Sequence, residues 1–111
     1  MKIISLDGIA EEGVSHNPEI RKRVMLRRGE VAHLTSFAES RLAPGQVTRA
    51  HVHADMFEVF FVVSGAGRIR SGDAEHALQA GTCIAVEPNE SHEIANDGAG
   101  ELVLIYFGIE A

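Results

Sequence analysis

The chain has 111 residues, 45% of them hydrophobic, which is enough for one hydrophobic core and too few for two ordinary domains. Its formal net charge of −6 argues against general nucleic-acid binding. No run reaches membrane-spanning length and the first residues lack the apolar core of a signal peptide, so we expect a cytoplasmic protein without membrane contact. A single cysteine, Cys83, cannot form an internal disulfide, and its apolar neighbours predict a buried thiol.

The N-terminal part, residues 1–20, is expected to hold a short strand over Met1–Leu6 and a polar arm over Asp7–Pro18, which has no clear period. Two strands are predicted next, over Lys22–Arg28 and Leu34–Leu42, and the turn residues 43–45 close the second.

Basic side chains gather around these two strands: Arg21, Lys22, Arg23, Arg27, Arg28 and Arg41. Charged side chains at the edge of a sheet discourage pairing with other sheets, so we interpret the cluster as a solvated strand edge. An anion-binding role is the alternative.

The rest of the chain is predicted to form short strands separated by glycine, proline and Asn/Asp turns. They cover residues 46–53, 57–64, 68–71, 75–78, 83–87, 92–96 and 101–108. No segment predicts a helix, and this pattern favours an all-β single domain, an antiparallel sandwich or barrel. Its interior is expected to include Phe60, Val62, Ile84, Val86 and Leu104.

The stretch Gly45–Gly65 has the spacing of a metal site. His51 and His53 are two residues apart, so on an extended chain both imidazoles point to one face. Glu58 has the opposite parity, which requires residues 54–57 to turn or bulge before its carboxylate can join the two histidines. His92, after another strand-like run, is the fourth candidate ligand. Imidazole and carboxylate together suit a divalent transition metal ion: iron, manganese, nickel, cobalt, copper or zinc.

The other histidines are weaker candidates. His16 lies in the polar arm and His76 in a hairpin, where exposure is the default, while His33 precedes a strand that could line the barrel. Aromatic residues are more often core than site, but Phe60 shares the face of Glu58, and Tyr106 could line the same cavity.

At these residues the chain resembles the cupin family. Glycine, five residues, His-x-His, three or four residues, glutamate, six residues and glycine describe the first cupin motif, and residues 45–65 match it. The second motif matches residues 81–96 at Gly81, His92 and Asn96. It departs at Glu87, where the family usually has proline, and at Asn89, where it usually has glycine. Asparagine tolerates a positive φ better than other non-glycine residues, so the second change is mild.

The resemblance implies a jelly-roll barrel, a double-stranded β-helix, over the whole chain. Four protein ligands leave one or two positions of a five- or six-coordinate ion open, so a metal-dependent enzyme is the first functional hypothesis. It would act on a small polar molecule as a dioxygenase, isomerase or lyase. The runner-up is a binding module that captures a sugar or carboxylate without catalysis, and a purely structural metal site is the weakest reading. Glu87 is either a replacement for a structural proline or an added catalytic carboxylate.

Small cupins commonly pair through sheet faces, so the resemblance also implies a homodimer. Two apolar rows would need cover in such a dimer: Val59, Phe61 and Val63, and the run Leu102–Phe107.

Overall fold

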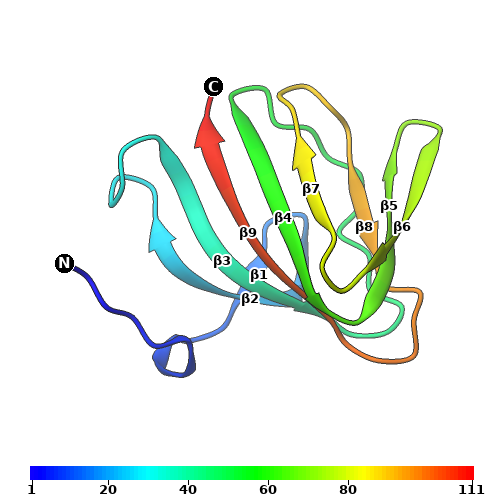
Figure 1. The fold of residues 1–111 in the computed structure, drawn as a ribbon, viewed down its shortest axis with the longest axis horizontal. Helices are drawn as coiled ribbons and strands as arrows, with labels where there is room; N and C mark the ends of the chain where they lie inside the picture. The colour runs from blue at the N-terminus through cyan, green and yellow to red at the C-terminus, as the bar shows by residue number, and fades with distance from the viewer.

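The computed structural model describes all residues 1–111 and confirms the expected all-β, single-domain jelly roll (Figure 1). Its only helix is a single 3-10 turn, and the chain contains no helix long and apolar enough to cross a membrane. The elements are η1 (Leu6–Gly8), β1 (Glu12–Val14), β2 (Asn17–Arg27), β3 (Leu34–Leu42), β4 (Met56–Ser64), β5 (Ala66–Ser71), β6 (Ala74–Gln79), β7 (Cys83–Val86), β8 (Glu93–Ala95) and β9 (Leu102–Glu110).

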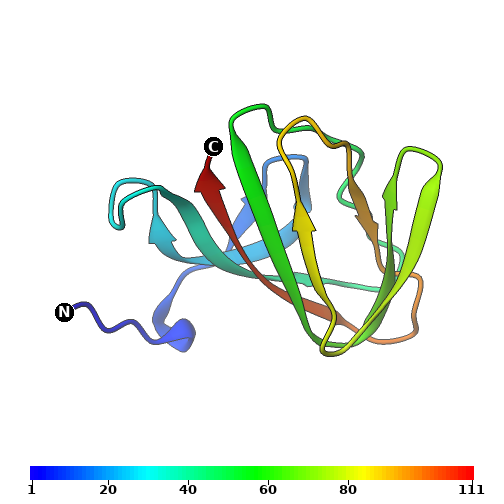
Figure 2. The same cartoon turned by 45° about the horizontal axis from the view of Figure 1, so that its top comes forward.

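Two antiparallel sheets enclose the interior. The larger has the strand order β1-β2-β3-β9-β4-β7 and the smaller the order β6-β5-β8. Figures 1 and 2 show the smaller sheet on the right, with the long strands of the larger sheet curving across the left and centre. The motif residues 45–51 run beside β8 and add an irregular fourth row to the smaller sheet, through isolated bridges at Val47 and His51.

The segment 46–53 was predicted as a strand, and this is only partly correct. Its backbone exchanges hydrogen bonds with residues 92–96, but the extended run is broken at Arg49, whose φ is 65°. A positive φ in a residue with a side chain is uncommon and ends regular pairing. The break separates two short paired pieces, and the second piece carries His51.

Strand parity on β4 follows the prediction. Glu58, Phe60 and Val62 face the interior and are at most 9% exposed, whereas Phe61 on the other face is 45% exposed. The buried core gathers the inward rows of both sheets: Ile20, Leu42, Phe60, Val62, Ile69, Leu78, Val86, Ile94, Leu102 and Leu104. The predicted core residue Ile84 packs against this cluster but is only partly buried.

The outer face of the larger sheet is also apolar, and this corrects two expectations. Cys83 was predicted to be buried, but its parity on β7 places it outside, exposed beside Phe61 of β4. The row Leu102–Phe107 was predicted to face outward, but Leu102 and Leu104 are core residues, and Val103 between them is buried as well. Apolar neighbours alone do not distinguish the two faces of such a sheet.

The N-terminal prediction was wrong in its details. Met1–Leu6 forms no strand, because no strand lies beside it, and Met1 and Ile3 are fully or largely exposed. The segment predicted as an arm contains β1 and the start of β2, which pair as a hairpin. β1 has three residues, too few to show an alternating pattern in sequence.

The basic cluster lies mainly on β2, which the short edge strand β1 covers only as far as Lys22, so Arg23 and Arg27 lie where β2 has no strand on its outer side. Its arginines are largely engaged: Arg27 pairs with Glu12 at 2.6 Å, Arg28 with Glu110, and Arg41 with Glu39 and Glu101. Lys22, by contrast, lines the interior cavity.

Candidate metal centre

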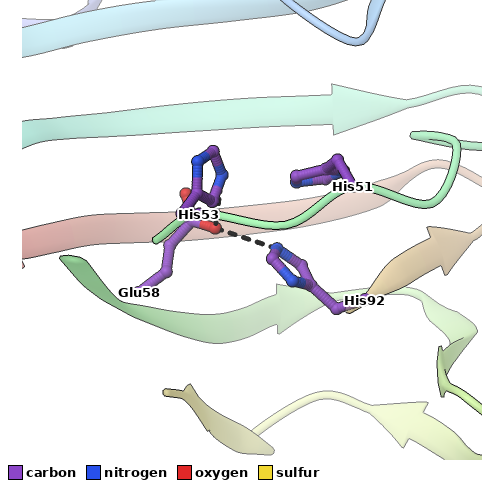
Figure 3. Close-up of side chains that lie close together, drawn as sticks. All are labelled: His51, His53, Glu58 and His92. Carbon is purple, nitrogen blue, oxygen red and sulfur yellow. Dashed lines mark hydrogen bonds and ion pairs between the residues drawn. The ribbon is translucent and has the colours of Figure 1, made fainter. Parts of the chain in front are cut away.

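The four residues predicted as metal ligands come together at one point inside the barrel. Ligand atoms of His51, His53, Glu58 and His92 all lie within 4.8 Å of one another. Figure 3 shows them converging from three segments: the irregular 45–53 stretch, β4, and the residues before β8. The predicted spacing therefore corresponds to one cluster.

Backbone pairing sets two of the ligands side by side. His51 and His92 occupy opposite positions of an antiparallel bridge and exchange both backbone hydrogen bonds, at 3.1 and 3.0 Å. Directly opposed residues of such a pair project to the same face, so the two rings meet with centroids 4.2 Å apart. The first cupin motif thus supplies His51 to this contact, and the second supplies His92.

Glu58 reaches the histidines by the predicted change of direction. Residues 54–55 form a bend, and β4 begins at Met56, so the strand restarts with Glu58 facing inward. Its Oε1 accepts a hydrogen bond from His92 Nε2 at 3.0 Å and lies 3.6 Å from His53 Nε2 (Figure 3). The carboxylate is 9% exposed, so it is desolvated and its partners are these imidazoles.

Two backbone carbonyls orient the rings. His51 Nδ1 lies 2.8 Å from the Arg49 carbonyl oxygen, and His92 Nδ1 lies 3.1 Å from that of Glu90. A carbonyl only accepts, so each Nδ1 carries the hydrogen and donates it. Nε2 of each ring then faces the cluster, an arrangement typical of metal-ligating histidines, and His92 Nε2 can bind a metal once the proton that it donates to Glu58 has left.

The two rings differ in how readily they take up a proton. Burial lowers the pKa of His51 to about 4, so this ring is neutral at neutral pH. Burial also opposes charging of His92, but the hydrogen bonds to Glu58 and to the Glu90 carbonyl outweigh it and raise the pKa of His92 above its ordinary value. Without an ion, the hydrogen bond between His92 and Glu58 therefore holds these two side chains of the cluster against each other.

The cluster fits a metal ion in its chemistry and its span. Ligand bonds of about 2.1 Å place two donors on opposite sides of an ion roughly 4.2 Å apart, comparable with the 4.8 Å limit here. Three imidazoles and one carboxylate are donors for divalent transition ions, and they leave positions open when the ion is five- or six-coordinate. The group can therefore hold a metal ion.

A cavity of about 170 Å³ opens beside the cluster and is lined by His51, His53 and Glu58. Phe60 and Tyr106 line it as well, as predicted, and their rings stack with centroids 5.4 Å apart. Burial, followed by the negative charges of Glu58 and Glu12, raises the pKa of the Tyr106 hydroxyl. The group therefore remains a neutral donor, and no protein atom accepts its hydrogen bond.

His16 was predicted to be exposed, and this is wrong. The turn of the β1–β2 hairpin brings its ring parallel to His51, with centroids 3.8 Å apart, and it lines the cavity. The contact joins residues 35 positions apart, and no local sequence pattern predicts it. His33 does not face the cavity: its side chain is 78% exposed, near Glu110. His76 is exposed, as expected.

The departures from the second motif are structural. Asn89 adopts a φ of 67°, which explains how it replaces a glycine. Glu87 is exposed, does not line the cavity beside the metal cluster, and donates its backbone N–H to Glu90 Oε1, which a proline could not do. Asn96 is 2% exposed, and its amide donates to the carbonyls of Leu42 and Gly100. None of the three is a candidate ligand.

Known proteins resemble this chain over most of its length. An oxalate-binding protein from Thermotoga maritima is 30% identical over 83 residues, covering 66% of this chain and 69% of that protein. A crystal structure of a predicted oxalate decarboxylase from Thermotoga maritima matches with a TM-score of 0.91 and 23% identity, covering 99% of this chain and 100% of the other. A sugar phosphate isomerase from Silicibacter pomeroyi matches with a TM-score of 0.83 and 18% identity, covering 99% and 76%.

The family comparison agrees with the motifs. The model of the family described as Cupin domain matches residues 38–108, which include both motifs and all four residues of the cluster. With this match and the jelly-roll architecture, the chain belongs to the cupin family.

Proposed function

We propose that this cupin holds one divalent transition metal ion between His51, His53, Glu58 and His92 and acts there as a metal-dependent enzyme on a small carboxylate. One observation carries the proposal: four ligand atoms converge on the wall of a cavity that is open to a ligand. A structural site is usually closed by four protein ligands in tetrahedral geometry, with no cavity beside it. The bound ion would supply a Lewis acid for a carboxylate oxygen.

The chain's own residues have separate tasks in this proposal. The Arg49 and Glu90 carbonyls fix the orientation of the His51 and His92 rings before a ligand arrives. Tyr106, held by its stacking on Phe60, offers an unpaired hydroxyl to a ligand oxygen in the cavity. A donor fixed in advance stabilises charge on that oxygen without further reorganisation.

Two observations support a small carboxylate as the ligand. The cavity of about 170 Å³ is comparable with a protein cavity of about 150 Å³ that binds benzene, a molecule of six heavy atoms. The relative from Thermotoga maritima is named an oxalate-binding protein, and oxalate has that size. Cleavage of a carbon–carbon bond in such a ligand would make the protein a lyase.

A second candidate function is capture of a carboxylate or sugar without turnover. It is favoured by the scarcity of acids in the cavity, where Glu58 is the only carboxylate and belongs to the metal cluster. General acid–base catalysis by a second carboxylate is thereby excluded, and proton transfer would fall to other groups.

The test begins with protein stripped of metal and reloaded with each candidate ion in turn. Calorimetry with oxalate, malonate and acetate measures binding, and analysis of the same mixtures under air and under nitrogen measures product and oxygen consumption. Metal-dependent binding with product formation supports the enzyme, and metal-dependent binding without any product supports capture. Equal binding by stripped and reloaded protein would overturn both.

A further inference from the structure

Lys22 is the one basic side chain among the residues that line the cavity, apart from its histidines. It projects inward from β2, where it pairs in register with Ser40 of β3, and Ser40 lines the cavity too. The neighbouring arginines of β2 make ion pairs or hydrogen bonds to backbone carbonyls, with the exception of Arg23. Lys22 thus differs from the rest of the basic cluster in where it points.

The Lys22 ammonium has no ion pair or hydrogen bond within the chain. Its cross-strand neighbour on β1 is Glu12, but the carboxylate of Glu12 is bound by Arg27 at 2.6 Å. Lys22 is half-buried, and the one carboxylate that lines the same cavity, Glu58, is bound by His92, so the ammonium has no anionic partner there. An anion in the cavity would supply that partner.

Lys22 and the metal cluster face the same small space. The His16 ring stacks on His51, and both rings line the cavity together with Lys22. Because that cavity has a volume of only about 170 Å³, a ligand of a few atoms inside it lies near both Lys22 and the metal cluster.

The charges that line the cavity define the ligand. Glu58 contributes −1 and Lys22 +1, so they cancel, and a divalent ion leaves the cavity with a net charge of +2. The complementary ligand is a dianion, and a single carboxylate neutralises only half of this charge.

We infer that Lys22 binds the second anionic group of a small dicarboxylate whose first carboxylate is held at the cluster of His51, His53, Glu58 and His92. The inference rests on the proposed function and deepens it, because it names the ligand class and the residue that selects it. Lysine acts here as a compact point charge at the end of a flexible stem, which suits a group that different dicarboxylates place differently.

The test compares two ligands of almost equal shape, oxalate and oxamate, in which an uncharged amide replaces one carboxylate. Calorimetry measures their dissociation constants for the metal-loaded wild type and for Lys22→Met, which keeps an apolar stem and removes the charge. Lys2→Met is the matched control, since Lys2 is the only other lysine and is a surface residue paired with Glu30. Metal content per chain and thermal unfolding are recorded for every variant.

We expect the wild type and Lys2→Met to bind oxalate more tightly than oxamate. In Lys22→Met the affinity for oxalate should fall about 10- to 100-fold, the range for losing a hydrogen bond to a charged group, while oxamate binding changes little. Metal content should stay that of wild type, because Lys22 is not a ligand.

The outcomes separate the two proposals. If the wild type binds neither ligand in the presence of metal, the proposed function fails, and this inference with it. If the wild type binds oxalate and Lys22→Met binds it equally well with unchanged metal content, Lys22 does not select the ligand, and the proposed function stands. Should Lys22→Met fail to fold, Lys22→Gln takes its place in the same comparison.

Discussion

The two ends of the barrel interior are built differently. At one end, Leu42 pairs in register with Leu102 and both are 0% exposed, with Val62 equally buried beside Leu104. At the other end the inward positions carry the Glu58 carboxylate and three imidazoles, beside an open cavity. The first end is closed by apolar packing together with the buried Asn96 amide, which donates to the Leu42 carbonyl, and the second is polar and open to a cavity.

This difference teaches that the residues that stabilise the fold and the residues proposed to bind metal and ligand lie at different ends of the barrel. The apolar end supplies burial energy that does not depend on an ion, whereas small metal-dependent domains with almost no core fold only when the metal is bound. Changes at the closed end should therefore act on the free energy of unfolding. Changes at the metal end should act on metal and ligand binding.

The largest effect is expected at the closed end, from Leu102→Ala. Removing a fully buried leucine side chain lowers the free energy of unfolding by about 2–5 kcal/mol, through lost burial and the cavity left behind. Denaturant titration measures it, with Ile109→Ala as control on the same strand. Ile109 is 40% exposed, and its truncation should cost less than about 1 kcal/mol. Equal losses in the two variants would contradict the proposed division.

At the metal end, His92→Ala should abolish stoichiometric metal yet leave the protein folded. Loss of a direct ligand should weaken metal affinity by at least the roughly 10- to 100-fold seen when an outer-shell partner is lost. The melting temperature should fall at least to that of stripped wild type, because a bound ion adds stability only to the native state and the variant also loses the hydrogen bond to Glu58. Metal analysis and sedimentation check this, with the exposed His76→Ala as control. An unfolded or aggregated His92→Ala variant would make the metal structural.

Acid should empty the metal end before it unfolds the closed end. As the pH falls, His92, with its raised pKa, takes up a proton before His51, whose pKa is about 4. Metal occupancy should therefore decline from near the ordinary histidine pKa of about 6.5, while circular dichroism still reports a folded protein.

The same pKa shifts determine whether the metal-free protein gains or loses stability as the pH changes. The raised pKa of His92 stabilises the fold below a pH of about 6.5, and this contribution is lost as the pH rises through the raised value. His51 acts in the opposite sense and costs stability as the pH falls from about 6.5 to about 4. For the metal-loaded protein, a metal occupancy that stays constant as the pH is lowered to the pH of unfolding would count against histidine ligation.

The smallest effect on the fold is expected on the outer face of the larger sheet. The homodimer stays a prediction. Of the row that it would cover, Phe61 and Val63 are exposed and Val59 is half-buried, and the exposed Phe57 extends the row on the same face. Light scattering should give a dimer mass for wild type at micromolar concentration and a monomer mass for Phe61→Glu, with thermal unfolding of the protomer little changed. A wild-type monomer under those conditions would rule the prediction out.

The residues that the sequence places correctly are those set by local periodicity. His51, His53 and Glu58 follow from strand alternation plus one bend, and the inward row Glu58, Phe60 and Val62 follows from the same alternation. His92 needed the second motif, because nothing local relates it to Glu58, which lies 34 positions away.

The residues that the sequence misplaces depend on long-range contacts or on the choice between two apolar faces. His16 reaches the cavity through the β1–β2 hairpin, whose first strand is too short to show a pattern. Cys83 has the neighbours of a core residue but the parity of the outer face. Arg49 interrupts a run that would otherwise continue as a strand, by a positive φ that its residue type does not suggest.

The most direct test of the metal centre is a crystal structure of the purified protein with anomalous data at the transition-metal absorption edges. We expect one ion bound by His51, His53, Glu58 and His92 at about 2.0–2.2 Å, with at least one further position facing the cavity beside Tyr106. A closed tetrahedral site, an ion held elsewhere, or no ion after growth with each candidate metal would contradict the account.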